Sequence, residues 1–172
     1  MANAPPSKVT VSARWPRGDD SVGIGWVTGP ASLVDAVRTT KQFLTFVSGG
    51  PFQFAVAHAL EHEMRFVDEL RESMARRRDL LTEGLAATGL EAFRPRGTYF
   101  VTTDVRSVGW DDALAFCRQL PHDVGVVGVP CSVFYADPGP AERALVRWTF
   151  SKRENVLREA LARLSTLRTP ER

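Results

Sequence analysis

The stretch Val146-Arg147-Trp148-Thr149-Phe150-Ser151-Lys152 lies near the end of the chain and decides how the rest is interpreted. Its residues favour a β-strand, in which successive side chains point to opposite faces. Arg147 would then be fixed on a rigid element and present a planar fork of N–H donors to one side. Such a fork suits bidentate capture of a carboxylate. The sequence therefore predicts a carboxylate-binding arginine on the last strand of the fold.

Three further segments precede this strand, and their order is informative. They are Ile24-Gly25-Trp26-Val27-Thr28-Gly29-Pro30, Pro95-Arg96-Gly97-Thr98-Tyr99-Phe100 and Gly128-Val129-Pro130-Cys131-Ser132-Val133-Phe134-Tyr135. With the last strand they resemble the C-terminal part of a class I/II pyridoxal-phosphate-dependent aminotransferase, in the kynurenine-type and N-succinyldiaminopimelate-type branch. The resemblance runs from about Ser21 to about Leu167. It implies amino-group transfer between an amino acid and a 2-oxo acid, with pyridoxal phosphate as cofactor and Arg147 on the substrate α-carboxylate.

The family motifs also define what this sequence does not match. Family members carry a Ser-Lys pair, whose lysine forms the Schiff base, shortly before the Gly-Trp segment, and a basic phosphate-binding residue directly before it. Here Gly23 stands directly before Ile24-Gly25-Trp26, where the family has the basic residue. The Ser7-Lys8 pair lies several residues too far upstream to match the Ser-Lys motif. Lys8 is the candidate for the Schiff base, but its polar, proline-rich surroundings indicate a solvated tail lysine. We therefore expect a chain that lacks the N-terminal half and the catalytic lysine motif and is inactive alone.

Periodicity and breakers divide the chain into four parts: a disordered tail at 1–20, a segment at 21–50, a long helix at 51–88 and a C-terminal part at 89–172. The resemblance implies that 21–50 is a remnant of the large cofactor-binding domain, 51–88 the connecting helix and 89–172 the small domain. Strands are expected at 23–28, 90–93, 98–103, 125–128 and 144–150. Further helices are expected at 32–46, with Ser32 as N-cap, and at 111–120 and 153–167. The alternation predicts an α/β layered sandwich. The resemblance makes it the small domain of a fold type I transferase plus a remnant of the large-domain sheet.

Several side chains near the motif segments have two interpretations. In the resembled family the Tyr99 segment brings an aromatic side chain towards the substrate pocket, but packing in the small-domain core explains Tyr99 equally well. The same two interpretations hold for Phe134 and Tyr135. Cys131 stands where the family has a small glycine, which would alter its loop. Cys117 and Cys131 have no metal-ligand spacing and are interpreted as reduced thiols.

A second motif, His58-Ala59-Leu60-Glu61-His62, spells the inverted zincin pattern. The spacing puts both histidines on one face of a helix, one turn apart. A zinc peptidase would need a third carboxylate ligand, for which Glu142 and Glu154 are only guesses. The pattern also falls in a helix that the aminotransferase resemblance already explains, so no metal site is predicted, and the peptidase remains the remote alternative.

The composition limits which binding partners and which cellular compartment we expect. The net charge of +2 is too small to argue for nucleic acid or membrane binding, and the N-terminus lacks the apolar stretch of a signal peptide. We expect a cytoplasmic protein whose ligand is an amino-acid or 2-oxo-acid carboxylate of unspecified side chain. The alternative is a non-catalytic interaction module, because losing the large domain would expose the long helix and four phenylalanines. Its partner would be a chain carrying the missing half or a second copy, as in the homodimeric relatives. The phenylalanines are Phe43, Phe46, Phe52 and Phe54.

Overall fold

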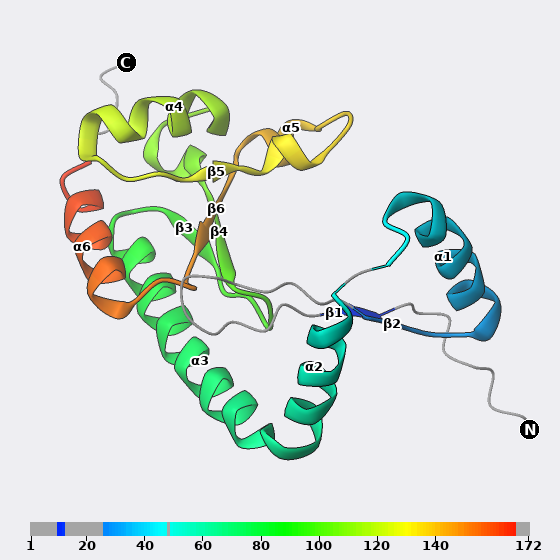
Figure 1. Cartoon of the computed structure of the whole chain (residues 1–172). Helices are drawn as coiled ribbons and strands as arrows, with labels where there is room; N and C mark the ends of the chain where they lie inside the picture. The colour runs from blue at the N-terminus through cyan, green and yellow to red at the C-terminus, as the bar shows by residue number, and fades with distance from the viewer. Residues whose placement is uncertain (1–9, 13–25, 48, 168–172) are drawn as a thin grey trace, which may run out of the picture. The chain divides into compact units, whose positions relative to one another are not determined.

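The computed structural model describes residues 10–12, 26–47 and 49–167. The chain divides into two compact units, Met1–Val67 and Asp68–Arg172. Figure 1 labels the elements of both. Among the described residues, no helix combines the length and the apolar character that crossing a membrane requires.

The first unit contains a small antiparallel sheet and two helices. Strand β1 (Thr10–Ser12) pairs with β2 (Trp26–Thr28), and α1 (Ala31–Leu44) and α2 (Gly50–His62) follow. The prediction of a disordered tail is wrong for β1, whose backbone bonds to β2. The rest of the tail lies outside the described residues. Ser32 is not an N-cap either: α1 begins at Ala31 with Pro30 as its N-cap, and the N–H groups of Leu33 and Val34 donate to the carbonyl of Pro30.

The single helix expected over 51–88 is two helices. Helix α2 ends at His62, and α3 runs over Met64–Ala87. Between them, Glu63 has φ −117° and ψ 26°, outside the helical region. Its N–H still donates to the carbonyl of Ala59, while its own carbonyl accepts from Phe66 and so starts the next helix. No proline or glycine lies at this break, which explains why the apolar periodicity predicted one continuous helix.

The second unit has a four-stranded, fully antiparallel sheet in the order β3-β4-β6-β5. Its strands are β3 (Glu91–Phe93), β4 (Phe100–Asp104), β5 (Val129–Pro130) and β6 (Leu145–Thr149). The remaining helices are α4 (Ala113–Val124), α5 (Pro140–Arg143) and α6 (Glu154–Leu164), with short 3-10 helices η1 (Val105–Val108) and η2 (Cys131–Phe134). The mixed helix-and-sheet class is as expected, although the strand before η2 starts later than the sequence suggested.

The core of this unit lies on one face of the sheet. In β4 and β6, buried residues alternate with half-buried ones, as a sheet covered on one face requires. The buried side chains of the strands pack with those of α3, α4 and α6. The principal members are Leu81, Leu85, Val101, Phe116, Leu120, Val146, Trp148, Leu157 and Leu164.

Strands β4 and β5 begin later than the sequence predicts, because local backbone geometry excludes the expected first residues. Gly125 has φ 68° and forms the left-handed C-cap of α4, so the strand expected at 125–128 cannot start there. Gly128 packs so closely on β6 that an added Cβ would lie 2.7 Å from Val146 Cγ1. Strand β5 begins only at Val129. Thr98 has φ 65°, which places it before β4 rather than in it.

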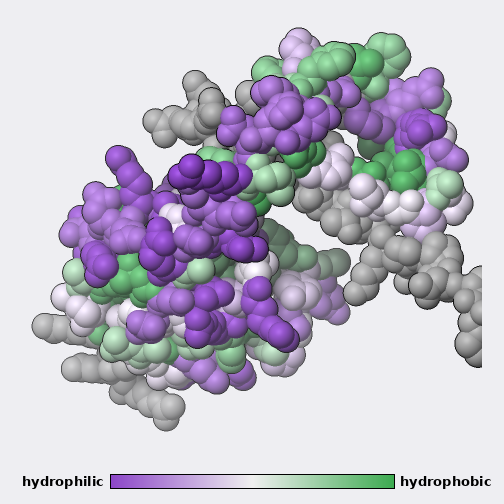
Figure 2. Space-filling view, turned by 90° about the horizontal axis from the view of Figure 1, so that it is seen from below, coloured by the Kyte–Doolittle hydropathy of each residue, from purple (hydrophilic) through white to green (hydrophobic). Residues whose placement is uncertain are grey.

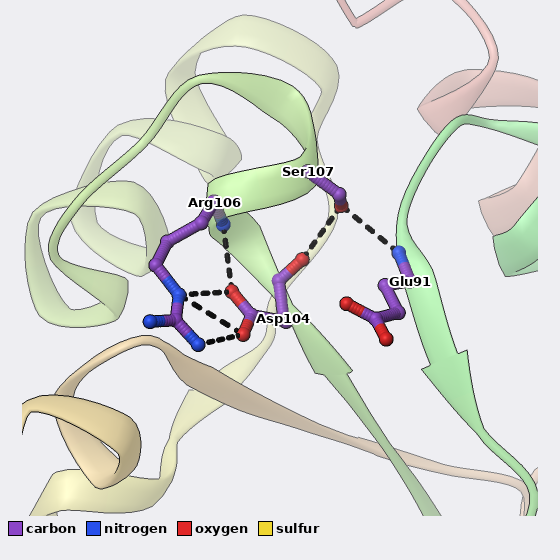
Figure 3. A network of polar contacts seen from close by, with 4 residues as sticks. All are labelled: Glu91, Asp104, Arg106 and Ser107. Carbon is purple, nitrogen blue, oxygen red and sulfur yellow. Dashed lines mark hydrogen bonds and ion pairs between the residues drawn. The ribbon is translucent and has the colours of Figure 1, made fainter.

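A buried carboxylate connects β4 to η1 and β3. Asp104 is 4% exposed and accepts hydrogen bonds from the backbone N–H of Arg106 at 2.9 Å and from its guanidinium Nε at 3.0 Å. Ser107 donates to the carbonyl of Asp104 and accepts from the N–H of Glu91, as Figure 3 shows. The hydrogen bonds from Arg106 hold the pKa of Asp104 below its usual range, and burial opposes them only in part. Ionisation of Asp104 therefore strengthens its contact with Arg106 at the end of β4.

This network predicts acid sensitivity. Because the pKa of Asp104 is lower in the folded chain than in the unfolded one, its stabilising contribution is complete above the unfolded value of about 3.9 and is lost as the pH falls through the folded value. Asp104→Asn should lower the free energy of unfolding at pH 7 by about 1–2 kcal/mol, a discounted figure because Arg106 is half exposed. The same substitution should flatten the loss of stability between pH 5 and pH 3. Urea unfolding of both chains at several pH values measures this, with the exposed Asp137→Asn as control. Equal slopes for wild type and Asp104→Asn would contradict it.

The two cysteines are buried thiols. Cys117 on α4 and Cys131 at the start of η2 are each 9% exposed and free. Burial raises the pKa of Cys117 to about 12. Burial also raises the pKa of Cys131, and the positive charge of Arg147 offsets part of that rise. Both thiols should therefore stay protonated near neutral pH.

The thiols should react slowly with disulfide reagents in the native protein, because the thiolate is the reacting form. At pH 8 we expect both native thiols to react at least about tenfold more slowly than an exposed cysteine introduced by Ser165→Cys. In denaturant, two thiols should react rapidly. A time course with an aromatic disulfide reagent measures both rates. If either native cysteine matched the introduced one, the burial described above would be wrong in solution.

Candidate functional site

Arg147 lies on the face of the sheet opposite the core. In the register of β4 and β6, Arg147 pairs with Thr102, while its neighbour Trp148 pairs with Val101. Trp148 and Val101 are buried, whereas Arg147 and Thr102 are half-buried. On the other side, Arg147 pairs with Val129 of β5. The guanidinium is therefore carried by a central strand and points away from the hydrophobic core.

Aromatic rings surround the guanidinium. Its central carbon lies 3.8 Å from the centroid of the Phe100 ring and 5.3 Å from the ring centroids of Tyr99 and Phe134. Its Nη2 donates a hydrogen bond of 3.1 Å to the hydroxyl oxygen of Tyr99. Cation–π contacts of this kind contribute about 0.5–1 kcal/mol at exposed sites. The rings therefore orient Arg147 without neutralising its charge.

Arg147 forms no ion pair with any residue in the described part of the chain. Arg78, Arg94, Arg106 and Arg163 of the same unit each have a carboxylate partner. Their guanidinium donors already serve the folded structure. At Arg147 most of the five donors remain available to an external anion. The arrangement can bind a carboxylate.

The turn before β4 holds Tyr99 in place. Thr98 has φ 65°, a conformation that a β-branched residue rarely adopts. The Phe100 N–H bonds to Thr98 Oγ1, and the carbonyl of Tyr99 accepts from the N–H of Phe150 at 2.9 Å. A strained backbone conformation of this kind persists only where surrounding contacts hold it in place, and such conformations are frequent at ligand sites. Tyr99 is half exposed beside Arg147, so it lines the candidate site rather than the core.

Of the three aromatic residues left open by the sequence, the structure brings two to Arg147. Tyr99 bonds to the guanidinium, and Phe134 of η2 lies near it with 60% of its surface exposed. Tyr135 is exposed and is not among the described aromatic residues that contact Arg147. Sequence reasoning missed Phe100, whose ring stacks on the guanidinium. Its signal was available in strand alternation, because Phe100 and Arg147 fall on the same face once the strands are paired.

Pyridoxal phosphate needs a desolvated amine and a phosphate cradle. Lys41 of α1 is exposed and donates to Thr45 Oγ1, and Lys152 is exposed after β6. Neither lysine has the buried frame that a Schiff base requires. Lys8 and Gly23 lie outside the described residues. The described residues therefore do not fit the cofactor, although they fit a carboxylate.

The inverted zincin motif folds as a helix face without a third ligand. His58 and His62 lie on α2 with ring centroids 4.4 Å apart, and Glu61 Oε2 lies 3.7 Å from His62 Nε2. Within the described residues, no group of three or more His, Cys, Asp or Glu is placed to hold a metal ion.

A separate apolar hollow of about 370 Å³ lies beside α6. Its lining includes Val126, Val127, Trp148 and Val156, with Lys152 and Arg163 among the charged residues. It does not include Arg147, Tyr99 or Phe134. The hollow is therefore distinct from the candidate carboxylate site.

Comparison with known proteins supports the sequence resemblance. The family model for aminotransferase class I and II matches residues 21–164. The chain is 45% identical over 152 residues to a Mycobacterium tuberculosis H37Rv protein named "Probable N-succinyldiaminopimelate aminotransferase DapC", covering 84% of this chain and 38% of that protein. It is 35% identical over 144 residues to the methionine aminotransferase of Escherichia coli K12, with coverage of 84% and 37%.

Solved structures give the same result. The N-succinyldiaminopimelate aminotransferase from Mycobacterium tuberculosis superposes with a TM-score of 0.75 at 48% identity, over 82% of this chain and 36% of that one. The YbdL protein of Escherichia coli, described as having a methionine aminotransferase function, gives a TM-score of 0.73 at 36% identity, over 83% and 37%. The chain thus spans less than two fifths of the length of these relatives. It belongs to the aminotransferase class I and II family.

Proposed function

We propose that this chain provides the substrate-carboxylate site of a pyridoxal-phosphate-dependent aminotransferase, with Arg147 binding the carboxylate of an amino acid or 2-oxo acid. The observation that carries the proposal is an oriented guanidinium with no carboxylate partner among the described residues. Family membership supports the substrate class. Tyr99, bonded to the guanidinium, is assigned as the second substrate-binding residue.

The carboxylate site should be weak in this chain alone. An exposed ion pair contributes about 0–1 kcal/mol, and bidentate geometry adds to it only moderately. We therefore expect a dissociation constant of about 1 mM or weaker, since 1 mM already corresponds to a binding free energy of about −4 kcal/mol. Aromatic orientation helps because a guanidinium already held in place loses less side-chain entropy when it binds.

Catalysis would need more than the described residues. Transamination needs an electron sink, which pyridoxal phosphate would supply and which the described residues do not hold. The described lysines do not supply its Schiff base, so turnover would require Lys8, in the part not described, or another polypeptide. The relative at 45% identity makes N-succinyldiaminopimelate a reasonable first substrate to test.

Substitution of Arg147 tests the proposal. In NMR titrations of the full chain with 2-oxoglutarate and with N-succinyldiaminopimelate, we expect saturable shifts at β4, β6 and η2. Arg147→Gln should abolish saturation, whereas Arg147→Lys should weaken binding about three- to tenfold, because an ammonium keeps the charge but loses the fork.

The matched control is Arg118→Gln, which removes an exposed arginine on α4 in the same unit. It should bind as wild type does. Unchanged binding by Arg147→Gln would contradict the proposal, as would shifts centred away from β6.

A second candidate function, association with another polypeptide, rests on the first unit. Helix α1 buries none of its residues. Five large apolar side chains in or near α1 and α2 are 73–83% exposed: Phe43, Leu44, Phe46, Val47 and Phe54. Figure 2 shows hydrophobic residues at the surface among hydrophilic ones. Apolar exposure of this density is characteristic of interaction surfaces, and we infer that another polypeptide, either a second copy or a chain with the remaining aminotransferase segments, covers it.

Association can be measured directly. Light scattering after gel filtration should show a mass above 19.0 kDa that decreases on dilution. Phe43→Glu with Phe54→Glu should shift the mass towards the monomer, because burying each new carboxylate without a partner is costly.

Val127→Glu is the matched control, since Val127 is 73% exposed in the second unit. A monomeric wild type that also fails to bind a co-expressed polypeptide carrying the remaining segments of an aminotransferase would exclude this function.

A further inference from the structure

The histidine pair of α2 is not used by the carboxylate site. His58 and His62 are four residues apart, so their side chains leave the same face of the helix, one turn apart. Their ring centroids are 4.4 Å apart, and both residues are exposed. Both imidazoles therefore reach solvent side by side on a rigid element.

We propose that His58 and His62 form a two-ligand binding site for a divalent transition-metal ion of the Cu²⁺, Ni²⁺ and Zn²⁺ class. Imidazole nitrogens bind these ions at about 2.0–2.1 Å, so two rings in contact can share one ion after small side-chain rotations. The helix holds the second imidazole beside the first, which gives it a high effective concentration once one nitrogen is bound. Water completes the coordination.

The charge around the pair favours a cation. Glu61 Oε2 lies 3.7 Å from His62 Nε2, so a carboxylate stands next to the site without being held by a strong hydrogen bond to the ring. Its negative charge should raise the affinity for a divalent ion by lowering the local potential. The side chains of Glu61 and His62 are 72% and 57% exposed, so solvent screens this contribution.

The chemistry of the ligands sets the selectivity. Nitrogen ligands bind Cu²⁺ more tightly than Ni²⁺ or Zn²⁺, whereas Mg²⁺ and Ca²⁺ prefer oxygen. Structural and catalytic zinc sites use three or four protein ligands, and no such group occurs in the described residues. The site is therefore a binding site of moderate affinity and not a hydrolytic centre.

The binding experiment uses the full, tag-free chain with NiCl₂ and CuCl₂ in isothermal titration calorimetry. We expect one ion per chain, tighter binding of Cu²⁺, and no binding of MgCl₂. His58→Gln or His62→Gln should weaken binding at least tenfold, and Glu61→Gln about two- to fivefold. The chain has three histidines; the third, His122, is exposed on α4, so His122→Gln is a matched control that should bind as wild type does.

A second readout needs no substitution. Addition of substoichiometric Cu²⁺ to the wild-type chain should broaden the imidazole NMR signals of His58 and His62 and spare those of His122. The proposal would be overturned by absence of binding, by equal losses in His122→Gln and His58→Gln, or by broadening at His122. Because the pair belongs to the first unit and Arg147 to the second, we expect Arg147→Gln to leave metal binding unchanged, so failure of the carboxylate proposal is separable from failure of this one.

Discussion

The pairing register of β4 and β6 is the constraint on which the second unit depends. It is fixed inside the core by the hydrogen bond from Trp148 Nε1 to Thr103 Oγ1, 2.8 Å long and buried. A shift of one residue would turn every side chain of β6 to the opposite face. Trp148 would then leave its contact with Phe116, and the charge of Arg147 would enter an apolar core. Burying a charge without a partner costs several kcal/mol, so the register is strongly determined.

The same register creates the candidate site. Alternation that sends Trp148 and Val146 inward must send Arg147 outward, and pairing with β4 places Phe100 on the same side. Tyr99 reaches Arg147 from the turn before β4, where Thr98 has φ 65°. Stability and binding geometry therefore come from one pairing and not from two independent designs. Arg147 is oriented by rings and a neutral hydroxyl, which leaves its charge available. A carboxylate among those neighbours would have occupied the fork that a ligand needs.

Sequence reasoning placed most elements of the second unit within a few residues, because alternation and helical periodicity reflect burial on one face. It failed where backbone geometry overrides side-chain pattern. The helix break at Glu63 has no proline or glycine to signal it. The late start of β5 depends on the left-handed C-cap at Gly125 and on the close approach of Gly128 to β6. The role of Arg147 as a carboxylate ligand remains a prediction. Phe100 was missed because its contact with Arg147 arises from strand pairing between residues far apart in the sequence, which no local pattern reveals.

The two units differ in how much of their apolar surface they bury. The second unit closes a core around Phe116, Trp148 and Leu85, all at most 4% exposed, so the geometry around Arg147 has its own folding support. The first unit leaves Phe43 and Phe54 at 80% exposure or more. Hydrophobic burial is the dominant favourable contribution to folding, so the first unit gains stability by covering its surface, whereas the second does not need to. An oriented guanidinium can thus be retained by the second unit whether or not a cofactor site is assembled, which separates the proposed carboxylate binding from transamination in physical terms.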